Sequence, residues 1–340
     1  MLKYILKRLA MSVLILVGVS LIIYILIRCM PVSYIDKLIA DMNQGGATIP
    51  EETKQAMLAQ YGLDDNSFKG IITGYLRWWG LAPDYSGHLN GLLQGNFGIS
   101  FKYKEPVLNV IKDNMGVSFF IALIATFFEF MIAVPLGITA ATHQYSFRDY
   151  VVTILVMVGI SLPSFFFGQV LKSILALELG WFPASGWIDA TQTLSAGQLL
   201  LDYARYAFIP ILTVVILSIG GRMRMTRTNM LEVLNSDYIR TARAKGLKER
   251  VVIYKHAFRN TLIPLVTSLA GLLPSLFSGA IITEQVFALP GIGNIAFQAM
   301  SAGDIPFIMG YNMFLAILSV LGVLLADLMY AVVDPRVKLT

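Results

Sequence analysis

The sequence contains few of the side chains on which enzyme and metal chemistry usually depend. Its 340 residues include one cysteine and three histidines, and 14% are charged, against about 25% in an ordinary soluble domain. The single cysteine, Cys29, cannot form an internal disulfide. His88, His143 and His256 lie far apart, and no H-E-x-x-H or C-x-x-C pair occurs. These absences argue against a zinc or redox site.

Motifs for nucleotide binding and nucleophilic catalysis are also missing. No G-x4-G-K-[ST] phosphate loop occurs, so we expect the chain to bind no ATP and no other cofactor. The segment "GISLPS" lacks the second glycine of a G-x-S-x-G nucleophile elbow. A membrane enzyme is therefore poorly supported, and it would show activity in the isolated chain.

Long apolar runs are abundant, and 56% of the residues are hydrophobic. The run "LAMSVLILVGVSLIIYILI" (residues 9–27) carries no charge and can cross a bilayer core of about 30 Å as a helix. Helices are expected because lipid leaves no partner for free backbone groups. Basic residues precede this run, as in a signal sequence, but its apolar core is longer and no small-x-small cleavage site follows. We expect a retained anchor helix.

The pattern predicts an all-α integral membrane protein with an extracytoplasmic segment, residues 30–112, between its first two helices. Prolines and glycines interrupt several of the apolar runs. They indicate either close packing of tilted helices or a lined translocation path, and the two are compatible. The six predicted transmembrane helices are 9–29, 116–141, 150–177, 207–226, 261–288 and 307–333.

Basic residues are concentrated on one side of the predicted helices. Sixteen of the 26 lysines and arginines fall in the segments assigned to that side. They are Lys3, Lys7, Arg8, Arg148, ten between Arg222 and Arg259, Arg336 and Lys338. The positive-inside rule then places both termini in the cytoplasm and residues 30–112 outside. The net charge of +5 is a topology signal, and no nucleic-acid partner is expected.

The densest basic block is "SDYIRTARAKGLKERVVIYKHAFRN" (residues 236–260). Capping residues at 235–237 and Gly246 predict two short helices around a left-handed glycine. The second helix has an apolar stripe at α-helical spacing, made of Leu247, Val251, Tyr254 and Phe258. Such a hairpin could contact anionic lipid, bind nucleic acid, or dock a cytoplasmic protein. Nucleic acid is disfavoured because no recognised motif or interleaved aromatic residues occur.

A few charged residues lie within the apolar runs, where they are costly in lipid and usually face a bundle interior or a cavity. Glu129 could pair with a neighbour or line the route of a substrate. Lys172 is expected near the outer end of its helix, where it can snorkel. Glu284 lies in the segment "TEQVFALPGIG".

Several segments resemble one protein family. The hairpin resembles the cytoplasmic loop of binding-protein-dependent ABC importer permeases, whose pattern is E-A-A-x3-G-x9-I-x-L-P. Only Ala242 and Gly246 match that pattern, but "DYIRTARAKGL" followed by "HAFRN" resembles the peptide-importer branch. Its B-type permease subunit is also indicated along nearly the whole chain. The matching segments are "YGLDDN", "GLLQGNFGISFKYKEPV", "GISLPSFF", "LGWFPASG", "TEQVFALPGIG" and "DPRVKL".

The resemblance implies a type I ABC importer permease fold, with an anchor helix and extracytoplasmic segment over 1–112. The transmembrane domain would span 113–335, with a coupling loop at 227–260. In the family this loop sits in a groove on an ATPase subunit. The implied contact residues are Asp237, Tyr238, Arg240, Thr241, Ala242, Arg243, Lys245, Gly246, Leu247 and Arg250. Glu129, Pro163 and Glu284 are candidate pathway or gate residues.

The implied function is that of a permease subunit of an ATP-driven oligopeptide or dipeptide importer in the bacterial plasma membrane. Its partners would be a second homologous permease subunit, two cytoplasmic ATPase subunits carrying ATP and Mg, an extracytoplasmic peptide-binding protein and membrane lipid. A related importer of nickel, glutathione or another small solute remains an alternative. So does an ion-coupled secondary transporter, which would work without ATPase subunits and depend on a carboxylate such as Glu129. Residues 30–112 are either a cap or a docking surface for the binding protein.

Overall fold

The computed structural model describes residues 2–29, 65, 67–83, 87–188, 195–268 and 271–333. The secondary structure of these ranges is helical, apart from one isolated bridge between Ile99 and Pro106. They belong to two compact units, one of Met1–Gly116 with Ile295–Val320, the other of Val117–Asn294 with Leu321–Thr340. Much of the predicted extracytoplasmic segment, most of "YGLDDN", and "DPRVKL" lie outside the described residues.

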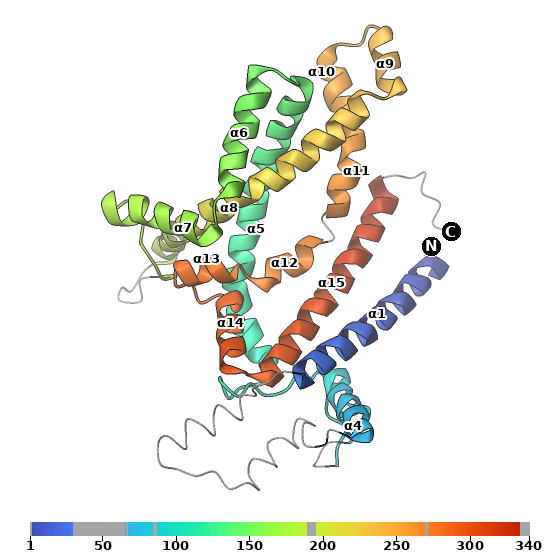
Figure 1. The fold of residues 1–340 in the computed structure, drawn as a ribbon, viewed down its shortest axis with the longest axis vertical. Coiled ribbons are helices and arrows are strands. Elements are labelled where there is room, and N and C mark those ends of the chain that lie inside the picture. Colours follow the sequence, from blue (N-terminus) through green and yellow to red (C-terminus); the bar gives the residue numbers. More distant parts are fainter. Residues whose placement is uncertain are drawn as a thin grey trace. The chain divides into compact units, whose positions relative to one another are not determined.

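Four helices in the described ranges are long and apolar enough to cross a membrane. They are α1 (Leu2–Arg28), α5 (Val107–Thr142), α8 (Ala196–Leu234) and α15 (Ile305–Val333) (Figure 1). A fifth span results if the bent pair Phe147–Ser161 and Ser164–Glu178 counts as one. This pair consists of α6 (Phe147–Ser161), α7 (Ser164–Lys172) and a π-helical turn, Ser173–Glu178. The chain is therefore a multi-pass membrane protein.

Two predicted helices are not continuous. The helix predicted over 150–177 bends by 98° at Pro163, because proline removes a backbone donor and keeps the preceding residue, Leu162, extended. The helix predicted over 261–288 is instead three short ones, α11 (Arg259–Ser268), α12 (Leu272–Ser278) and α13 (Ile281–Val286). The last break falls at Gly279 and Ala280, whose backbones leave helical geometry.

The first unit packs α4 (Phe68–Trp79) against α1 and the start of α15. Tyr24 and Ile27 of α1 are buried with Ile305 and Met309 of α15. The Ser20 hydroxyl lies 2.7 Å from the Tyr75 hydroxyl and accepts a hydrogen bond from the indole of Trp79. Side chains of α4 therefore satisfy a polar group of the anchor helix.

A completely buried carboxylate, Asp304, organises the rest of this unit. It accepts hydrogen bonds from the Ser100 hydroxyl and from the backbone N–H groups of Phe101 and Lys102. It also caps the first turn of α15 through the N–H of Phe307 at 3.2 Å. One side chain thus fixes the turn before α5 to the junction between α14 (Ile292–Ala302) and α15.

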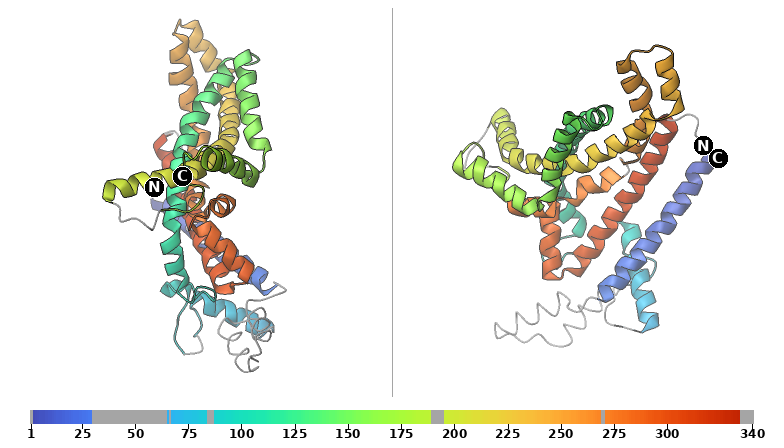
Figure 2. Two further views of the ribbon diagram at one scale, coloured as in Figure 1. Left: turned by 90° about the vertical axis from the view of Figure 1, so that its left-hand side faces the viewer. Right: turned by 45° about the horizontal axis from the view of Figure 1, so that its top comes forward.

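The second unit contains most of α5, with α6 to α8 and α11 to α13. It also carries two further helices, α9 (Asp237–Ala244) and α10 (Glu249–Val251), at the end of α8 (Figures 1 and 2). Helix α8 continues to Leu234, beyond the predicted end at 226. Arg227 therefore lies on a helix rather than in the predicted coupling loop, and Arg222 and Arg224 lie on the helix as expected.

Candidate functional site

The basic block forms the predicted hairpin. Ser236 is extended before α9 begins, and Gly246 has a left-handed backbone with φ +73° after α9 ends. Space does not require a glycine here, since an added Cβ at Gly246 would meet nothing within 4 Å. The positive φ does require a glycine, because the backbone of any other residue is strained in that conformation. The predicted helix, glycine, helix order is confirmed.

Apolar contacts attach the hairpin to the long helices. Ile239 and Ala242 of α9 are buried in a cluster with Ile138 of α5, Met230 of α8 and Val252. A fully buried aliphatic side chain contributes about 1.5–3 kcal/mol. Displacement of the hairpin must therefore carry α5 and α8 with it or expose this cluster.

The apolar stripe predicted for the second helix holds at Phe258, which packs partly buried against this cluster, and fails at Leu247 and Tyr254. Val252 and Ala257 are completely buried, whereas Leu247 and Tyr254 are 40% and 54% exposed. The reason is a π-helical turn over Val252–Phe258, in which the residue spacing per turn exceeds that of an α-helix. Positions five apart then share the inner face, so an α-helical period selects the wrong residues.

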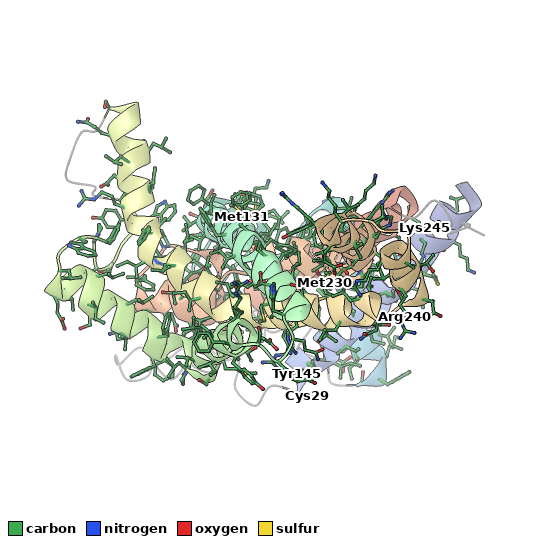
Figure 3. The ribbon with its side chains drawn as sticks, turned by 90° about the horizontal axis from the view of Figure 1, so that it is seen from above. Cys29, Met131, Tyr145, Met230, Arg240 and Lys245 are labelled. Atoms are coloured by element: carbon green, nitrogen blue, oxygen red, sulfur yellow. The ribbon has the colours of Figure 1, made fainter. Side chains whose placement is uncertain are left out.

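The outer face of the hairpin is polar and mainly cationic. Of the ten predicted contact residues, nine are exposed and one, Ala242, is buried. Residues 237–250 include five basic and two acidic side chains. The Arg240 side chain is 72% exposed, and Arg240 and Lys245 are labelled at the edge of the hairpin in Figure 3.

One ion pair joins the two arms of the hairpin. Arg243 donates to Glu249 at 2.7 Å and 3.2 Å. The hydrogen bond from Arg243 holds the pKa of Glu249 below its ordinary value, and burial opposes it more weakly. Both side chains are about half exposed, so the pair orients the turn around Gly246 more than it stabilises the fold.

A second charged cluster lies inside the helical unit. The guanidinium of Arg222 donates to Glu129 at 2.9 Å and to the Ser268 hydroxyl at 2.7 Å. It also lies 4.4 Å from the centre of the Phe130 ring. The cluster joins α5, α8 and α11. Of the two interpretations left open for Glu129, pairing with a neighbour is the one observed.

A buried carboxylate missed in the sequence neutralises another arginine of α8. Arg227 binds Asp149 through two hydrogen bonds, at 3.0 Å and 2.8 Å, and Asp149 is 4% exposed. The available signal was local, because Ser146 and Asp149 are spaced as a helix cap. The Ser146 hydroxyl accepts from the N–H of Asp149, and the Asp149 carboxylate accepts from the N–H of Tyr145.

Glu284, a candidate gate residue, is buried with its oxygens occupied. It is 2% exposed and accepts hydrogen bonds from Ser118 at 2.6 Å, from the N–H of Asn294 at 2.7 Å and from that of Ala280 at 3.2 Å. The carboxylate thus ties the loop between α13 and α14 to α5. In this conformation, the contacts of Glu284 do not place it on an open pathway.

The third candidate, Pro163, and the charged residue Lys172 both belong to the α6–α7 segment. Pro163 stands immediately before α7, where it sets the bend. Lys172 of α7 donates to the backbone carbonyl of Val286 at 3.0 Å. The sequence predicts Lys172 near the end of its helix, and it is the last residue of α7, where its ammonium group binds the carbonyl end of α13.

Comparison with known proteins identifies the family. Residues 133–339 match the model of the "Binding-protein-dependent transport system inner membrane component" family. The chain is 34% identical over 339 residues to the Oligopeptide transport system permease protein AppB of Bacillus subtilis (strain 168), covering 99% of this chain and 100% of that relative. It is 34% identical over 259 residues to OppB of Haemophilus influenzae, an oligopeptide transport system permease protein, covering 76% of this chain and 81% of that relative.

A solved structure supports the fold. The MetNI methionine ABC transporter, in an inward-facing conformation, aligns with a TM-score of 0.51 at 19% identity, over 67% of this chain and 97% of that chain. The helical architecture is therefore that of a type I ABC importer permease. The chain belongs to the family of binding-protein-dependent transport system inner membrane components.

Proposed function

We propose that the chain forms half of the translocation pathway of an ATP-driven peptide importer and that its α9–α10 hairpin docks on a cytoplasmic ATPase subunit. The observation that carries the proposal is the two-sided construction of the hairpin. Its inner face is anchored by Ile239 and Ala242 against α5 and α8, while its outer face is exposed and cationic. A rigid element transmits displacement that a flexible loop would absorb.

Peptide is the proposed substrate because full-length relatives carry the names of peptide transport permeases. The assembly would contain this chain, a second homologous permease subunit, two ATPase subunits and an extracytoplasmic peptide-binding protein. It would lie in the bacterial plasma membrane with both termini of this chain in the cytoplasm. ATP and Mg would bind the ATPase subunits, and this chain would hold no cofactor.

The proposed mechanism is alternating access. ATP-driven closure of the ATPase pair moves the docked hairpin, and the buried cluster around Met230 passes that movement to α5 and α8. The paired permease subunits open outward and receive peptide from the binding protein. Hydrolysis then restores the inward-facing state. This chain performs no bond chemistry in any step.

The ion-coupled alternative loses support at Glu129. Its carboxylate is engaged by Arg222 at 2.9 Å in a nearly buried pair that joins two helices, which is a structural role. Uptake that persists after removal of the ATPase subunits would favour the alternative. Uptake assays with peptide, nickel and glutathione separate the importers of the same class.

Co-purification tests the docking surface. Arg240 and Lys245 are both exposed, so their replacement by glutamate should leave the hairpin folded and reduce recovery of the ATPase subunits. The matched control is the charge-equivalent replacement of Lys255 and Arg259, exposed residues outside the proposed contact set. Full recovery with the Arg240→Glu and Lys245→Glu variant would reject this surface.

A further inference from the structure

Helix α8 carries three arginines within six residues, and their environments differ. Arg222 binds Glu129, and Arg227 binds Asp149. Arg224 is exposed and has no carboxylate partner among the described residues; its recorded contact is from Nη2 to the Met157 sulfur at 3.6 Å. Two of the three charges are neutralised inside the unit, and the third is available to something outside it.

The guanidinium of Arg224 lies on the surface of the unit, beside the exposed Met157 of α6. Arg227 meets α6 at Asp149, near the start of that helix, whereas Arg224 meets it at Met157. Met157 lies ten residues after Phe147, which is about 15 Å along a helix. The side chain therefore runs away from the end of α8 that carries the hairpin, as side chains tilt in a helix. Arg224 therefore does not snorkel toward the end of α8 that carries the hairpin.

A groove of about 670 Å³ opens beside this side chain. Its polar lining consists of Ser218, Arg224, Thr228 and Asn229, all from α8, and no acidic residue lines it. The Nδ2 atom of Asn229 is buried and has no acceptor among the described residues. An exposed cation without a counterion is costly in hydrocarbon. Arg224 therefore indicates an aqueous surface that receives an anionic acceptor.

The groove is open and lies along one face of α8 beside Ile160 of α6. Its volume is within the range of about 300–1,000 Å³ seen for small-ligand sites. A guanidinium recognises a carboxylate through charge-assisted hydrogen bonds, and every linear peptide carries a C-terminal carboxylate whatever its sequence. We propose that the α8 groove lines the translocation path and that Arg224 binds the C-terminal carboxylate of the transported peptide. This inference rests on the proposed peptide transport function.

Uptake by the reconstituted importer, with its binding protein, tests the charge. The substrates are one peptide with a free C-terminus and the same peptide with an amidated C-terminus. For each peptide, uptake by the variant is divided by uptake by the wild type. Any preference of the binding protein for one of the two peptides then cancels from this ratio. Arg224→Gln should reduce uptake of the free-acid peptide about tenfold or more, the loss expected for a hydrogen bond to a charged group. For the amidated peptide, the ratio of Arg224→Gln uptake to wild-type uptake should stay near one. Arg224→Lys should retain most of the uptake of the free-acid peptide. Equal loss for both peptides, or no loss, would overturn the proposal.

A labelling experiment on the assembled importer tests the groove without the use of an amidated peptide. Thr228→Cys, in a Cys29→Ser background that removes the only native cysteine, should react with an anionic, membrane-impermeant thiosulfonate and be protected by saturating peptide. Adding Arg224→Gln should slow this reaction several-fold. Failure of the reagent to react, or reaction unaffected by peptide, would exclude the groove from the path.

The outcomes separate this inference from the proposed function. If Arg224→Gln loses the second permease subunit on purification, the groove is a subunit interface and the inference is wrong. If the wild-type assembly transports no peptide at all, the proposed function fails. Normal peptide transport with an unlabelled groove would leave the proposed function standing and remove only the role of Arg224.

Discussion

Replacing Glu129 by glutamine tests the charged cluster that joins α5, α8 and α11. The amide oxygen can still accept a hydrogen bond from Arg222, so the variant keeps the shape of the site and removes its negative charge. The guanidinium would then keep Ser268 and the Phe130 ring but lose its counterion. The expected result is destabilisation from an uncompensated buried charge.

The magnitude follows from burial. Removing one partner of a fully buried ion pair costs about 3–5 kcal/mol. The Arg222 and Glu129 side chains are 14% and 11% exposed, so some water screening remains and we expect a loss near the lower end, about 3 kcal/mol. Replacing Asp237 by asparagine is the control, because that carboxylate is 98% exposed and its pair with Arg240 is worth less than about 1 kcal/mol.

Thermal unfolding of the purified chain in detergent is the assay. Glu129→Gln should lower the midpoint by several degrees, whereas Asp237→Asn should leave it nearly unchanged. The variant with both Glu129→Gln and Arg222→Met should recover part of the loss, because it removes the stranded charge. A Glu129→Gln midpoint equal to that of the wild type would refute the reasoning, since it would mean that the pair is solvated.

Three further changes address other parts of the chain. Gly246→Val should cost about 1–2 kcal/mol, because its φ of +73° strains any other residue and a β-branched one most; ATP-dependent uptake should fall, and unchanged uptake would contradict the hairpin geometry. Asp304→Ala should cost at least about 1–3 kcal/mol by leaving buried donors such as the Ser100 hydroxyl unsatisfied, measured by thermal unfolding, with Asp304→Asn intermediate. The lowered pKa of Glu249 means that its pairing with Arg243 stabilises fully above the ordinary value of 4.5 and is lost as the pH falls through the lower, folded-state pKa; Glu249→Gln should abolish this pH dependence, and a loss appearing instead above pH 5 would contradict the sign.

Features that depend on local sequence were predictable. Helix α1 follows from the length of its apolar run. The left-handed backbone at Gly246 follows from the ability of glycine to adopt a positive φ after a helix. The exposed cations of α9 follow in the same way. Family resemblance added the expected role of the hairpin, which no local pattern supplies.

Features that depend on distant partners were not predictable. Glu129 and Arg222 are 93 positions apart, and charge counting assigned Arg222 to the cytoplasmic basic residues because it cannot recognise a pair within the helices. The π-helical turn over Val252–Phe258 arises where the hairpin packs on other helices, so an α-helical period missed Ala257. The break before α13 likewise accompanies contacts of Glu284 that join separate segments.

The enclosure of Glu284 restricts how this region can vary. An added Cβ at Gly291 would come within 2.5 Å of both carboxylate oxygens, and one at Gly293 would come within 2.9 Å of one of them. The acid occupies the room that these missing side chains leave, so a larger residue at either glycine would force the carboxylate to shift and disturb its hydrogen bonds. Shortening Glu284 to alanine would in turn leave a hole lined by unsatisfied amides. A tolerated substitution on one side of this contact should therefore be accompanied by a change on the other, the acid on one side and the glycines on the other. We expect residues 279–294 to vary together among related proteins.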